Sequence, residues 1–414
     1  MSTWLLTASL NTGFVQNDNY KFAYALCGIL DSVPGGGAEE PIVQLLIRDT
    51  YTLANCYIRI LANTLTNAAT LRSRVDAGNG NIAISLTALT SGVFEDAVNS
   101  DNLTTGELVN TEIDAPSGGT SITISLISYT LTSASDVPIL MAYPPGNSFN
   151  DGYLRFSPVG GDGTDSDTET ERQITMRAAT TLSNLSVYHD DNALDAATTV
   201  RLRVNGADVN QVISIPDWLL CGLTEDAVNT DAINVGDEVC WEIDVTASTS
   251  GSISILNIHC KSSSTGRQIM AGYGWIPSNL TRYNTVEGRF PSIVAEADTQ
   301  CTARCAFTAR NMCLNLYQNS LDGTSSVFTL RKNGADTTLT ISVPNGTTGI
   351  FEDLVHSVAF IATDLLNWKL VTDGSSGNIE FSFVSFQLDQ PAAPPPGAPA
   401  GGSVAGKMIA GELI

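Results

Sequence analysis

A threefold internal repeat is the feature that most constrains how this chain can fold. A segment with the pattern Gly-x-x-Glu-Asp begins at Gly92, Gly222 and Gly349, so successive copies lie roughly 130 residues apart. A second marker, an arginine close to a turn, keeps the same period and occurs as Arg74, Arg203 and Arg331. Two markers with one period indicate a single structural unit that is present three times in tandem.

The repeats divide the 414 residues into three modules and a tail. A looser marker, NDNYKF at Asn17 and NDGYLRF at Asn150, lies near the start of the first two modules. We predict module 1 over residues 1–135, module 2 over 136–264, module 3 over 265–390 and a proline-rich tail over 391–414. Each module is long enough to bury a core of its own.

Within each module the residue pattern is typical of β-strands. In module 2, apolar residues alternate with arginines from Val200 to Val204, and Asn205-Gly206 follows as a hairpin turn, because both residues tolerate positive φ. Module 3 repeats the turn at Asn333-Gly334, whereas Asp76-Ala77-Gly78 predicts a longer turn in module 1. Since no long amphipathic helix is evident, the sequence predicts an all-β fold of three tandem β-sandwich modules, each with roughly eight strands.

The last strand of each module shifts its apolar face halfway along. In module 1, Ile122 and Ile124 lie on one face, whereas Ile127, Tyr129 and Leu131 lie on the other. Because side chains alternate along a strand, the shift requires a bulge or a strand that is buried on both faces. We expect the second half of the strand to contact another sheet or the next module.

Short motifs near the hairpin turn resemble those of known families. The motifs are LRVNG at Leu202–Gly206, LRKNG at Leu330–Gly334 and VGDEV at Val235–Val239. They resemble the jelly-roll modules of the C1q and tumour-necrosis-factor type, and the repeated β-modules of bacteriophage head decoration and fibre proteins. The resemblance implies a jelly-roll-like sandwich and a role in assembly. The chain departs from the pattern at Gly106-Glu107 in module 1 and at Thr363-Asp364 in module 3.

The charge of the chain excludes some classes of partner. Its 43 acidic residues outnumber its 20 lysines and arginines, which gives a formal net charge of −23. Such a surface repels phosphate backbones, so we predict no nucleic-acid partner. The opening MSTWLLTASLNTGF has neither the basic start of a signal peptide nor the length of a membrane span. We therefore predict no membrane partner, and release by another route such as host lysis.

Residues suited to metal or acid–base chemistry are scattered in the sequence. The three histidines fall at different positions of the repeat, unlike the converging ligands of a zinc or catalytic site: His189, His259 and His356. In module 2, Asp165, Asp167 and Glu169 alternate along one loop. Alternating carboxylates can supply calcium ligands, but we favour a solvated hairpin tip over a calcium loop.

Adjacent carboxylates recur in all three modules. The pairs are Glu95-Asp96, Glu225-Asp226 and Glu352-Asp353. Catalytic carboxylates face each other across a cleft, whereas neighbours in a strand point to opposite faces, so the pairs predict a structural turn. Phosphate-binding loops and nucleophile elbows are absent from the sequence, and we predict neither an enzyme nor a cofactor. The eight cysteines lack a CxxC pair and are predicted to be mostly buried free thiols, with disulfides as the alternative.

The tail ends in an apolar peptide that resembles the segments between modules. It reads KMIAGELI, and similar segments around Met141 and Met270 follow modules 1 and 2, where we predict linkers. Because a lone apolar strand is unstable in water, segments of this kind are predicted to pair or pack along a sheet edge. The tail peptide is accordingly predicted to dock by β-augmentation. The predicted docking residues are Lys407, Met408, Ile409, Ala410, Leu413 and Ile414.

The tail peptide has three alternative fates. It docks on another subunit or an underlying shell, it docks on module 1 and closes a ring within the chain, or it frays in solvent. We favour the first, which predicts a non-enzymatic virion protein such as a bacteriophage capsid decoration or fibre protein. Its partners would be further copies of itself or neighbouring capsid or filament subunits, reached through the tail.

The alternative function is an extracellular filament subunit or a carbohydrate-binding adhesin at the cell surface. Sugar binding needs a repeated, exposed aromatic platform. Trp241 and Trp368 do recur between modules 2 and 3, but Thr111 stands at the matching position of module 1. Because both tryptophans sit inside strand patterns, we predict that they pack in the core.

Overall fold

The computed structural model describes residues 2–9, 13–15, 20–23, 28–29, 40, 44–115, 121–133, 138–143, 147–160, 165–264, 266–289 and 293–390. Strands dominate these residues, and helical structure within them is confined to short 3₁₀ segments such as Glu169–Glu171 and Glu296–Asp298. None of the helices in this part of the chain is long and apolar enough to cross a membrane. The prediction of an all-β chain is confirmed.

The strands of module 1 form two sheets. They are β1 (Ser2–Ser9), β2 (Gly13–Val15), β3 (Tyr20–Ala23), β4 (Gly28–Ile29), β5 (Leu45–Leu46), β6 (Tyr51–Asn63), β7 (Ala69–Val75), β8 (Gly78–Leu86), β9 (Gly92–Leu103), β10 (Leu108–Asp114) and β11 (Ser121–Ser133). One sheet has the order β4-β1-β11-β6-β9, and the other has the order β3-β10-β7-β8. The short strands β2 and β5 pair with β11 and β10.

Module 2 repeats this arrangement. Its strands are β12 (Pro138–Tyr143), β13 (Asn147–Asn150), β14 (Leu154–Pro158), β15 (Ile174–Thr175), β16 (Thr180–Asp190), β17 (Thr198–Val204), β18 (Ala207–Ile215), β19 (Gly222–Ile233), β20 (Glu238–Asp244) and β21 (Ser252–Ser263). The two sheets have the orders β12-β21-β16-β19 and β14-β20-β17-β18.

Module 3 follows the same plan. Its strands are β22 (Gly266–Pro277), β23 (Thr281–Asn284), β24 (Gly288–Arg289), β25 (Cys301–Thr302), β26 (Phe307–Asn319), β27 (Ser325–Lys332), β28 (Ala335–Pro344), β29 (Gly349–Phe360), β30 (Leu365–Val371) and β31 (Asn378–Asp389). The sheets have the orders β24-β22-β31-β26-β29 and β23-β30-β27-β28.

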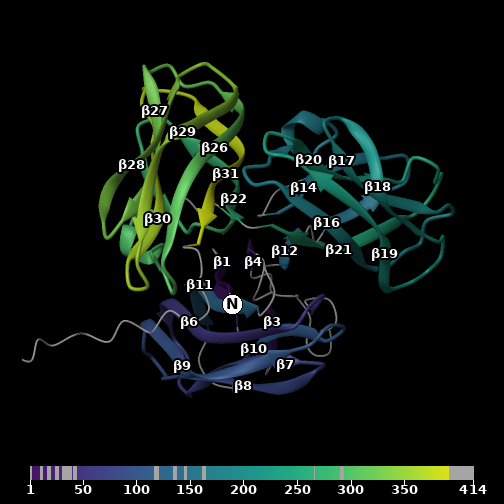
Figure 1. Ribbon diagram of the computed structural model, residues 1–414, viewed down its shortest axis with the longest axis horizontal. Coiled ribbons are helices and arrows are strands. Elements are labelled where there is room, and N and C mark those ends of the chain that lie inside the picture. Colours follow the sequence, from purple (N-terminus) through teal and green to yellow (C-terminus); the bar gives the residue numbers. More distant parts are fainter. Residues whose placement is uncertain are drawn as a thin grey trace, which may run out of the picture.

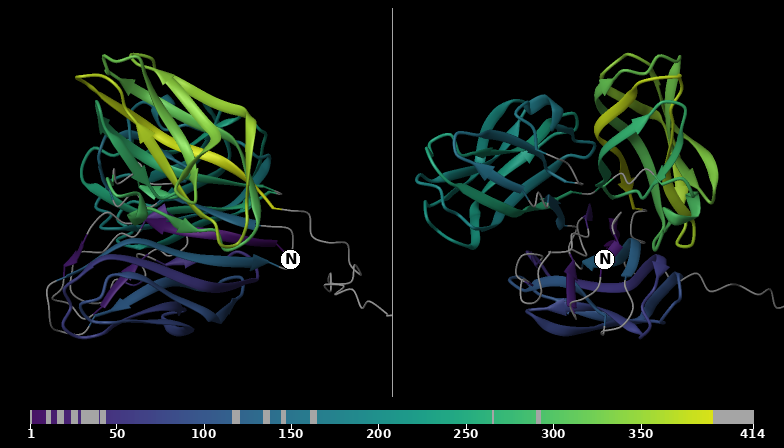
Figure 2. Two further views of the ribbon diagram at one scale, coloured as in Figure 1. Left: turned by 90° about the vertical axis from the view of Figure 1, so that its left-hand side faces the viewer. Right: turned by 180° about the vertical axis from the view of Figure 1, so that it is seen from behind.

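The strand order identifies each sandwich as a jelly roll. In every module the first long strand pairs with the last, and most successive strands cross from one sheet to the other. Crossing back and forth between two packed antiparallel sheets is the jelly-roll topology, so the prediction of an all-β, jelly-roll-like fold is confirmed. The three sandwiches form three lobes around a common centre (Figure 1), as the views from the side and from behind also show (Figure 2).

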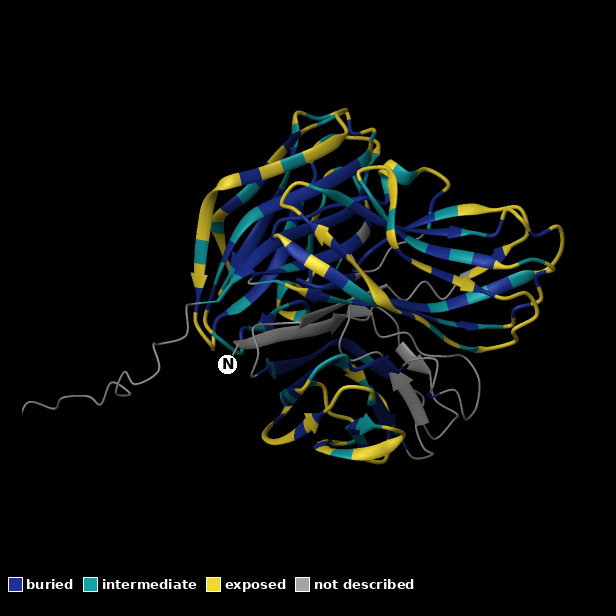
Figure 3. Cartoon of the chain, turned by 45° about the vertical axis from the view of Figure 1, so that its right-hand side comes forward, coloured by how far each residue is buried: buried dark blue, intermediate teal, exposed yellow. Residues whose placement is uncertain are grey.

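Each sandwich buries a core between its two sheets. Trp241 and Trp368 lie in these cores, with 0% and 1% of their surfaces exposed, which confirms the predicted packing role. At the matching position of module 1, the Thr111 hydroxyl lies 2.9 Å from the hydroxyl of Tyr129, which fills the space instead. Exposed residues gather on the outer edges of the lobes, whereas the strands near the centre are largely buried (Figure 3).

The turn between β17 and β18 explains why the LRVNG motif recurs. Asn205 and Gly206 both have positive φ, at 52° and 77°. Arg203 folds back over the turn and donates from Nη2 to the Gly206 carbonyl at 2.6 Å. In module 1, β7 and β8 are joined by a turn of the same length, in which Asp76 and Ala77 have φ values of 48° and 61°. The longer turn predicted there is wrong, because the flanking strands impose the left-handed backbone even on an alanine.

The shift of the apolar face in the last strand is a bulge, one of the two arrangements that the sequence allowed. The register between β11 and β6 slips on both sides of Ile124 and again after Ser128. As a result Ile124 and Ile127 both face the core of module 1, and Leu126 between them packs into the core of module 3. The expected contact with another module is therefore made by Leu126 at the bulge, whereas the apolar residues after it turn back to the opposite sheet of their own sandwich.

The segments predicted to be linkers are the first strands of modules 2 and 3. β12 pairs antiparallel with β21, and β22 pairs antiparallel with β31 along its whole length. Ile269 and Ala271 of β22 lie in the core of module 3, whereas Met270 lies in the core of module 2. Because both faces of β22 are buried, its sequence lacks the polar–apolar alternation that marks other strands. In module 1 the corresponding place beside β11 is held by β1.

Candidate functional site

Three arginines at matching positions of the repeat join the modules to one another. Arg48, Arg177 and Arg304 each follow a short strand, β5, β15 or β25, by two residues. Arg48 Nη1 lies 3.2 Å from Glu225 Oε2 in module 2, and Arg304 Nη2 lies 2.8 Å from Glu95 Oε2 in module 1. Arg177 pairs with Glu352 in module 3. The contacts therefore run from module 1 to 2, from 2 to 3 and from 3 back to 1.

Each arginine lies over a pair of residues that face each other across two strands. The pairs are Tyr57 with Glu95, Ser186 with Glu225, and Cys313 with Glu352. Arg304 stacks over the Tyr57 ring with its guanidinium carbon 4.9 Å from the centroid, and Arg48 donates to Ser186 Oγ. Arg177 Nη2 lies 2.8 Å from Cys313 Sγ. We call each arginine with its facing pair an arginine node.

The turn that carries the VGDEV motif positions the node arginines. The residue before each arginine donates its backbone N–H to the acidic residue of that turn: Ile47 to the Glu107 carbonyl at 2.8 Å, Met176 to Asp237 at 2.9 Å and Ala303 to Asp364 at 2.8 Å. In module 2 the Asp237 carboxylate accepts from Asn205 Nδ2 at 2.9 Å, which ties the turn to the Asn-Gly hairpin. The motifs that recur in the sequence therefore build the support of the node.

The node arginines are more deeply buried than their partners. The side chains of Arg48, Arg177 and Arg304 are 9%, 4% and 15% exposed. The partner glutamates are 32%, 34% and 50% exposed, so water screens the ion pairs in part. Burial raises the pKa of the Cys313 thiol, and Arg177 offsets this only partly, so the thiol stays protonated at neutral pH.

Apolar packing accompanies the nodes at two of the contacts between modules. Tyr57 and Leu126 of module 1 belong to the same buried cluster as the core of module 3. Met270, Cys313 and Phe383 of module 3 belong to the cluster of module 2. Between modules 1 and 2, Asn257 Nδ2 donates to the Gln44 carbonyl at 3.3 Å. The three lobes are therefore packed against one another rather than strung on a flexible chain.

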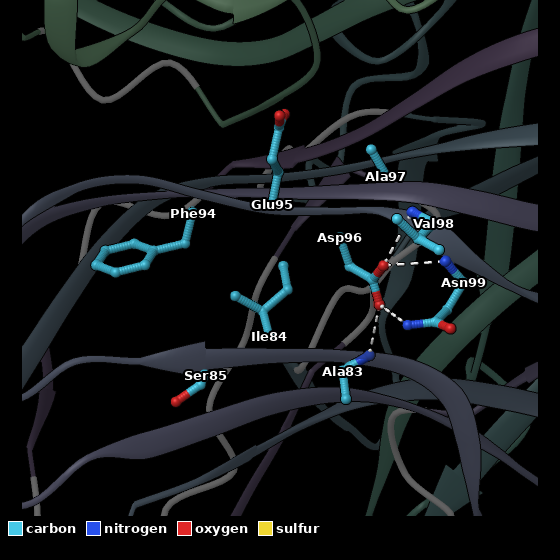
Figure 4. Close-up of a pocket in the computed structure, with 9 residues that line it drawn as sticks. All are labelled: Ala83, Ile84, Ser85, Phe94, Glu95, Asp96, Ala97, Val98 and Asn99. Carbon is cyan, nitrogen blue, oxygen red and sulfur yellow. Dashed lines mark hydrogen bonds between the residues drawn. The ribbon is translucent and has the colours of Figure 1, made fainter.

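The recurring Glu-Asp pairs have two separate roles. Glu95, Glu225 and Glu352 belong to the nodes. The aspartate that follows each of them accepts hydrogen bonds at a bulge of the same strand. The Asp96 carboxylate accepts from the N–H groups of Val98, Asn99 and Ala83 at 3.1, 3.0 and 3.0 Å, while Glu95 points away from it (Figure 4). Burial alone would raise the pKa of Asp96, but these donors together lower it. The pairs do not form the predicted turn, because they lie inside the strands β9, β19 and β29, where a register shift marks a bulge. The role is structural as expected, and Asp226 and Asp353 make the same contacts as Asp96.

The segment from Phe94 to Asn99 borders a shallow hollow of about 310 Å³ on module 1. It lies between β8 and β9, and its lining includes Ile84, Phe94 and Val98 (Figure 4). Asp96 lines the hollow, and its carboxylate oxygens accept hydrogen bonds from backbone N–H groups. A carboxylate that is held in this way ties the bulge of β9 to the neighbouring strand β8.

In the loop where we favour a solvated hairpin tip over a calcium site, two of the three carboxylates contact arginines. Arg203 donates from Nε and Nη2 to the two carboxylate oxygens of Glu169, at 3.2 and 3.1 Å. Arg155 Nε lies 3.4 Å from Asp165 Oδ2, and Asp167 is exposed. Across the ranges that the structure describes, no three acidic, histidine or cysteine side chains come together as metal ligands.

The three histidines lie apart, each in a local contact. Nε2 of His189 lies 3.1 Å from the Leu219 carbonyl, and Nδ1 of His259 lies 3.2 Å from Asn257 Oδ1. Nδ1 of His356 lies 3.0 Å from Asp353. Among the described cysteines five are buried free thiols, namely Cys56, Cys240, Cys260, Cys301 and Cys313, whereas Cys221 is exposed and Cys305 is half-buried.

Two sets of residues remain to be placed against the predictions. The docking residues of the tail, from Lys407 to Ile414, lie outside the described residues, as does Cys27. The node arginines were missed by the sequence reasoning. Their common period was visible, but LIRDT shares only the arginine with TMRAA and TARCA, and only the fold shows that each arginine contacts another module.

Comparisons with known proteins find similar solved structures only. No family description and no curated protein matches the chain. The chain is similar to one in “The Triple Jelly Roll Fold and Turret Assembly in an Archaeal Virus”, with 12% identity, 92% of this chain and 90% of that chain covered, and a TM-score of 0.21. It is also similar to one in “Life in the extremes: atomic structure of Sulfolobus Turreted Icosahedral Virus”, with 12% identity, 92% and 91% covered, and a TM-score of 0.20. Similarity at this level carries no functional argument, so the proposal below rests on the geometry of the chain itself.

Proposed function

We propose that the protein is a non-enzymatic structural protein of a virion and supplies a three-lobed building block to a capsid or its decoration. The observation that carries the proposal is the cycle of arginine nodes, which joins three jelly rolls of one chain head to tail, as identical subunits are joined in a closed trimer. The resemblance of the hairpin motifs to repeated virion modules supports the same role. The net charge of −23 keeps separate copies soluble until they assemble.

The predicted modules and their boundaries are part of this proposal. We take residues 1–135, 136–264 and 265–390 as the three domains of the building block. The grouping of strands into six sheets and of buried residues into three clusters supports the division.

The tail peptide is proposed to tie the building block to its neighbours by β-augmentation. β12 and β22, whose segments resemble the tail in sequence, are strands that pair with the last strand of a sandwich. Within one copy these positions beside β11, β21 and β31 are taken by β1, β12 and β22. Because every copy of the chain fills these positions itself, we propose that the tail pairs with another strand edge of the assembly, on a neighbouring subunit or an underlying shell.

The adhesin alternative has little support from the described residues. The aromatic residues that recur between modules, Trp241 and Trp368, are buried and cannot bind a sugar. The exposed tryptophans, Trp218 and Trp275, are 60% and 51% exposed and lie at unrelated positions of the repeat. A repeated binding platform is therefore not built from these side chains.

Truncation of the tail tests the proposal. Removal of residues 403–414 is expected to leave the three lobes folded and to abolish assembly, which electron microscopy and sedimentation velocity of the purified protein would show. A matched variant that carries Met408→Asp and Ile409→Asp keeps the tail length and should behave like the truncation. A truncated protein that still assembles would contradict the role of the tail, and a chain that forms no assembly at all would contradict the virion role.

A further inference from the structure

The three contacts between modules differ in how they are held. β12 begins at Pro138 soon after β11 ends at Ser133, and β22 begins at Gly266 directly after β21 ends at Ser263. Modules 1 and 2, and modules 2 and 3, are thus tied by short stretches of chain. Modules 3 and 1 are not consecutive, so no short stretch of chain ties them, although β24 of module 3 lies close to β1 and β4 of module 1. We call the contact between modules 3 and 1 the seam.

The seam buries apolar surface from both sides. Tyr57 and Leu126 of module 1 are 3% and 0% exposed, and they share one buried cluster with Cys301 and Ala303 of module 3. Arg304 Nη2 lies 2.8 Å from Glu95 Oε2 and its guanidinium covers the Tyr57 ring. An open ring would expose Tyr57 and Leu126 to water, so each half of the seam needs a partner.

The ion pair of the seam is the most exposed of the three. Glu95 is 50% exposed, compared with 32% for Glu225 and 34% for Glu352. Arg304 is 15% exposed, compared with 9% for Arg48 and 4% for Arg177. The seam is therefore the contact that water enters most easily, and it lacks a chain connection that would return the modules to each other after they part.

The two surfaces of the seam are different from each other and complementary. Head-to-tail contacts of this kind close a ring when both surfaces belong to one chain, and they link copies when they belong to two chains. Within one chain the effective concentration of the two surfaces is high, so the closed ring is the state of dilute protein. Copies that are concentrated by assembly bring a second set of the same surfaces within reach.

We infer that the seam is also a joining surface between copies, in which module 3 of one chain takes module 1 of a second copy through the Arg304–Glu95 node. The inference names a partner for the assembly role and rests on the proposed function. It differs from the role of the tail, because it uses only residues within the lobes. The exchange makes and breaks no covalent bond.

Charge reversal across two chains tests the inference. In an E95R chain, the new positive charge at position 95 faces Arg304, so repulsion opposes closure of the ring. In an R304E chain, the new negative charge at position 304 faces Glu95, with the same effect. Neither variant can form the node alone, in one chain or between identical chains. When the two are mixed, the arginine introduced at position 95 of one chain can pair with the glutamate introduced at position 304 of the other. The fraction of dimer in sedimentation velocity is therefore expected to rise at least tenfold over either variant alone.

Two controls make the result specific. The double variant E95R/R304E restores the pair within one chain and should form no more dimer than the unaltered chain. The matched pair R177E and E352R reverses the node between modules 2 and 3, which the chain holds together, so its mixture should form no dimer. Melting curves of all variants establish that they fold, and the more conservative pair E95Q and R304Q, which weakens the seam without repulsion, should form dimers at high concentration.

The outcomes separate the two ideas. A mixture of E95R and R304E that stays monomeric while both chains are folded would overturn the inference, as would equal dimer formation by either variant alone. In both cases the truncation of the tail still decides whether the proposed function holds, because every chain in the mixing experiment carries the same tail.

Discussion

Arg177 is the most deeply buried of the node arginines and contacts both Cys313 and Glu352. Its removal takes away an ion pair and the packing of a long side chain between two modules. We expect Arg177→Ala to lower the free energy of unfolding by about 2 kcal/mol. Arg310, which is 43% exposed and pairs with Asp389, is the matched control, and Arg310→Ala should change stability by less than about 1 kcal/mol. Urea unfolding compares the two, and equal losses would contradict the assigned role.

His259 predicts a loss of stability in mild acid. Burial, together with the smaller effect of nearby Arg48, lowers the pKa of His259 to about 3. The unfolded chain binds a proton at this histidine below about pH 6.5, whereas the folded protein does not, so the stability present above pH 6.5 falls as the pH drops toward 3. Serine stands at the matching position of module 1, where Ser128 pairs with Tyr57 as His259 pairs with Ser186. His259→Ser should therefore reduce the dependence of the unfolding free energy on pH by about one proton between roughly pH 6.5 and 5. The melting temperature of the unaltered protein and of the variant is measured against pH. Two parallel profiles would show that His259 does not cause the loss of stability in acid.

At the scale of elements, the hairpin turns give a pair of opposite predictions. Gly206 has a φ of 77° with open space around it, so Gly206→Ala should cost about 1 kcal/mol through backbone strain alone. Ala77 already bears this strain at a φ of 61°, so Ala77→Gly should stabilise the protein by about 0.5 kcal/mol or more. Thermal unfolding measures both changes. Shifts of the same sign would mean that the turns are not equivalent.

The elements also show where sequence reasoning succeeds. Alternation in Val200–Val204 and the Asn-Gly turn were sufficient to predict the strands and hairpin that carry Arg203. The expectation that the segments between modules pair along a sheet edge is confirmed by β12 and β22. Their extent as full first strands was not predicted, because Ile269, Met270 and Ala271 are all buried between two modules and show no alternation. The nodes could not be predicted at all, since Arg48 and Glu225 are brought together by the packing of separate sandwiches.

At the scale of the whole molecule, the seam makes modules 1 and 3 depend on each other. Tyr57→Ala removes a ring that lies in the shared cluster and under Arg304. Hydrogen exchange is expected to speed up in β6 of module 1 and also around β25 of module 3, because both lose packing from the same residue. The β17–β18 hairpin of module 2 is the internal control and should keep its protection. Faster exchange in β6 alone would show that the seam does not couple the two lobes.

The cycle of nodes has a consequence for how such a chain can change over generations. In a trimer of identical subunits, one substitution alters all three contacts at once, so a damaging change is felt threefold. Here the three nodes are encoded by separate parts of the sequence. The residue that contacts the arginine differs among them and is Tyr57, Ser186 or Cys313. One side of the building block can therefore acquire a new neighbour while the other two sides continue to hold it together.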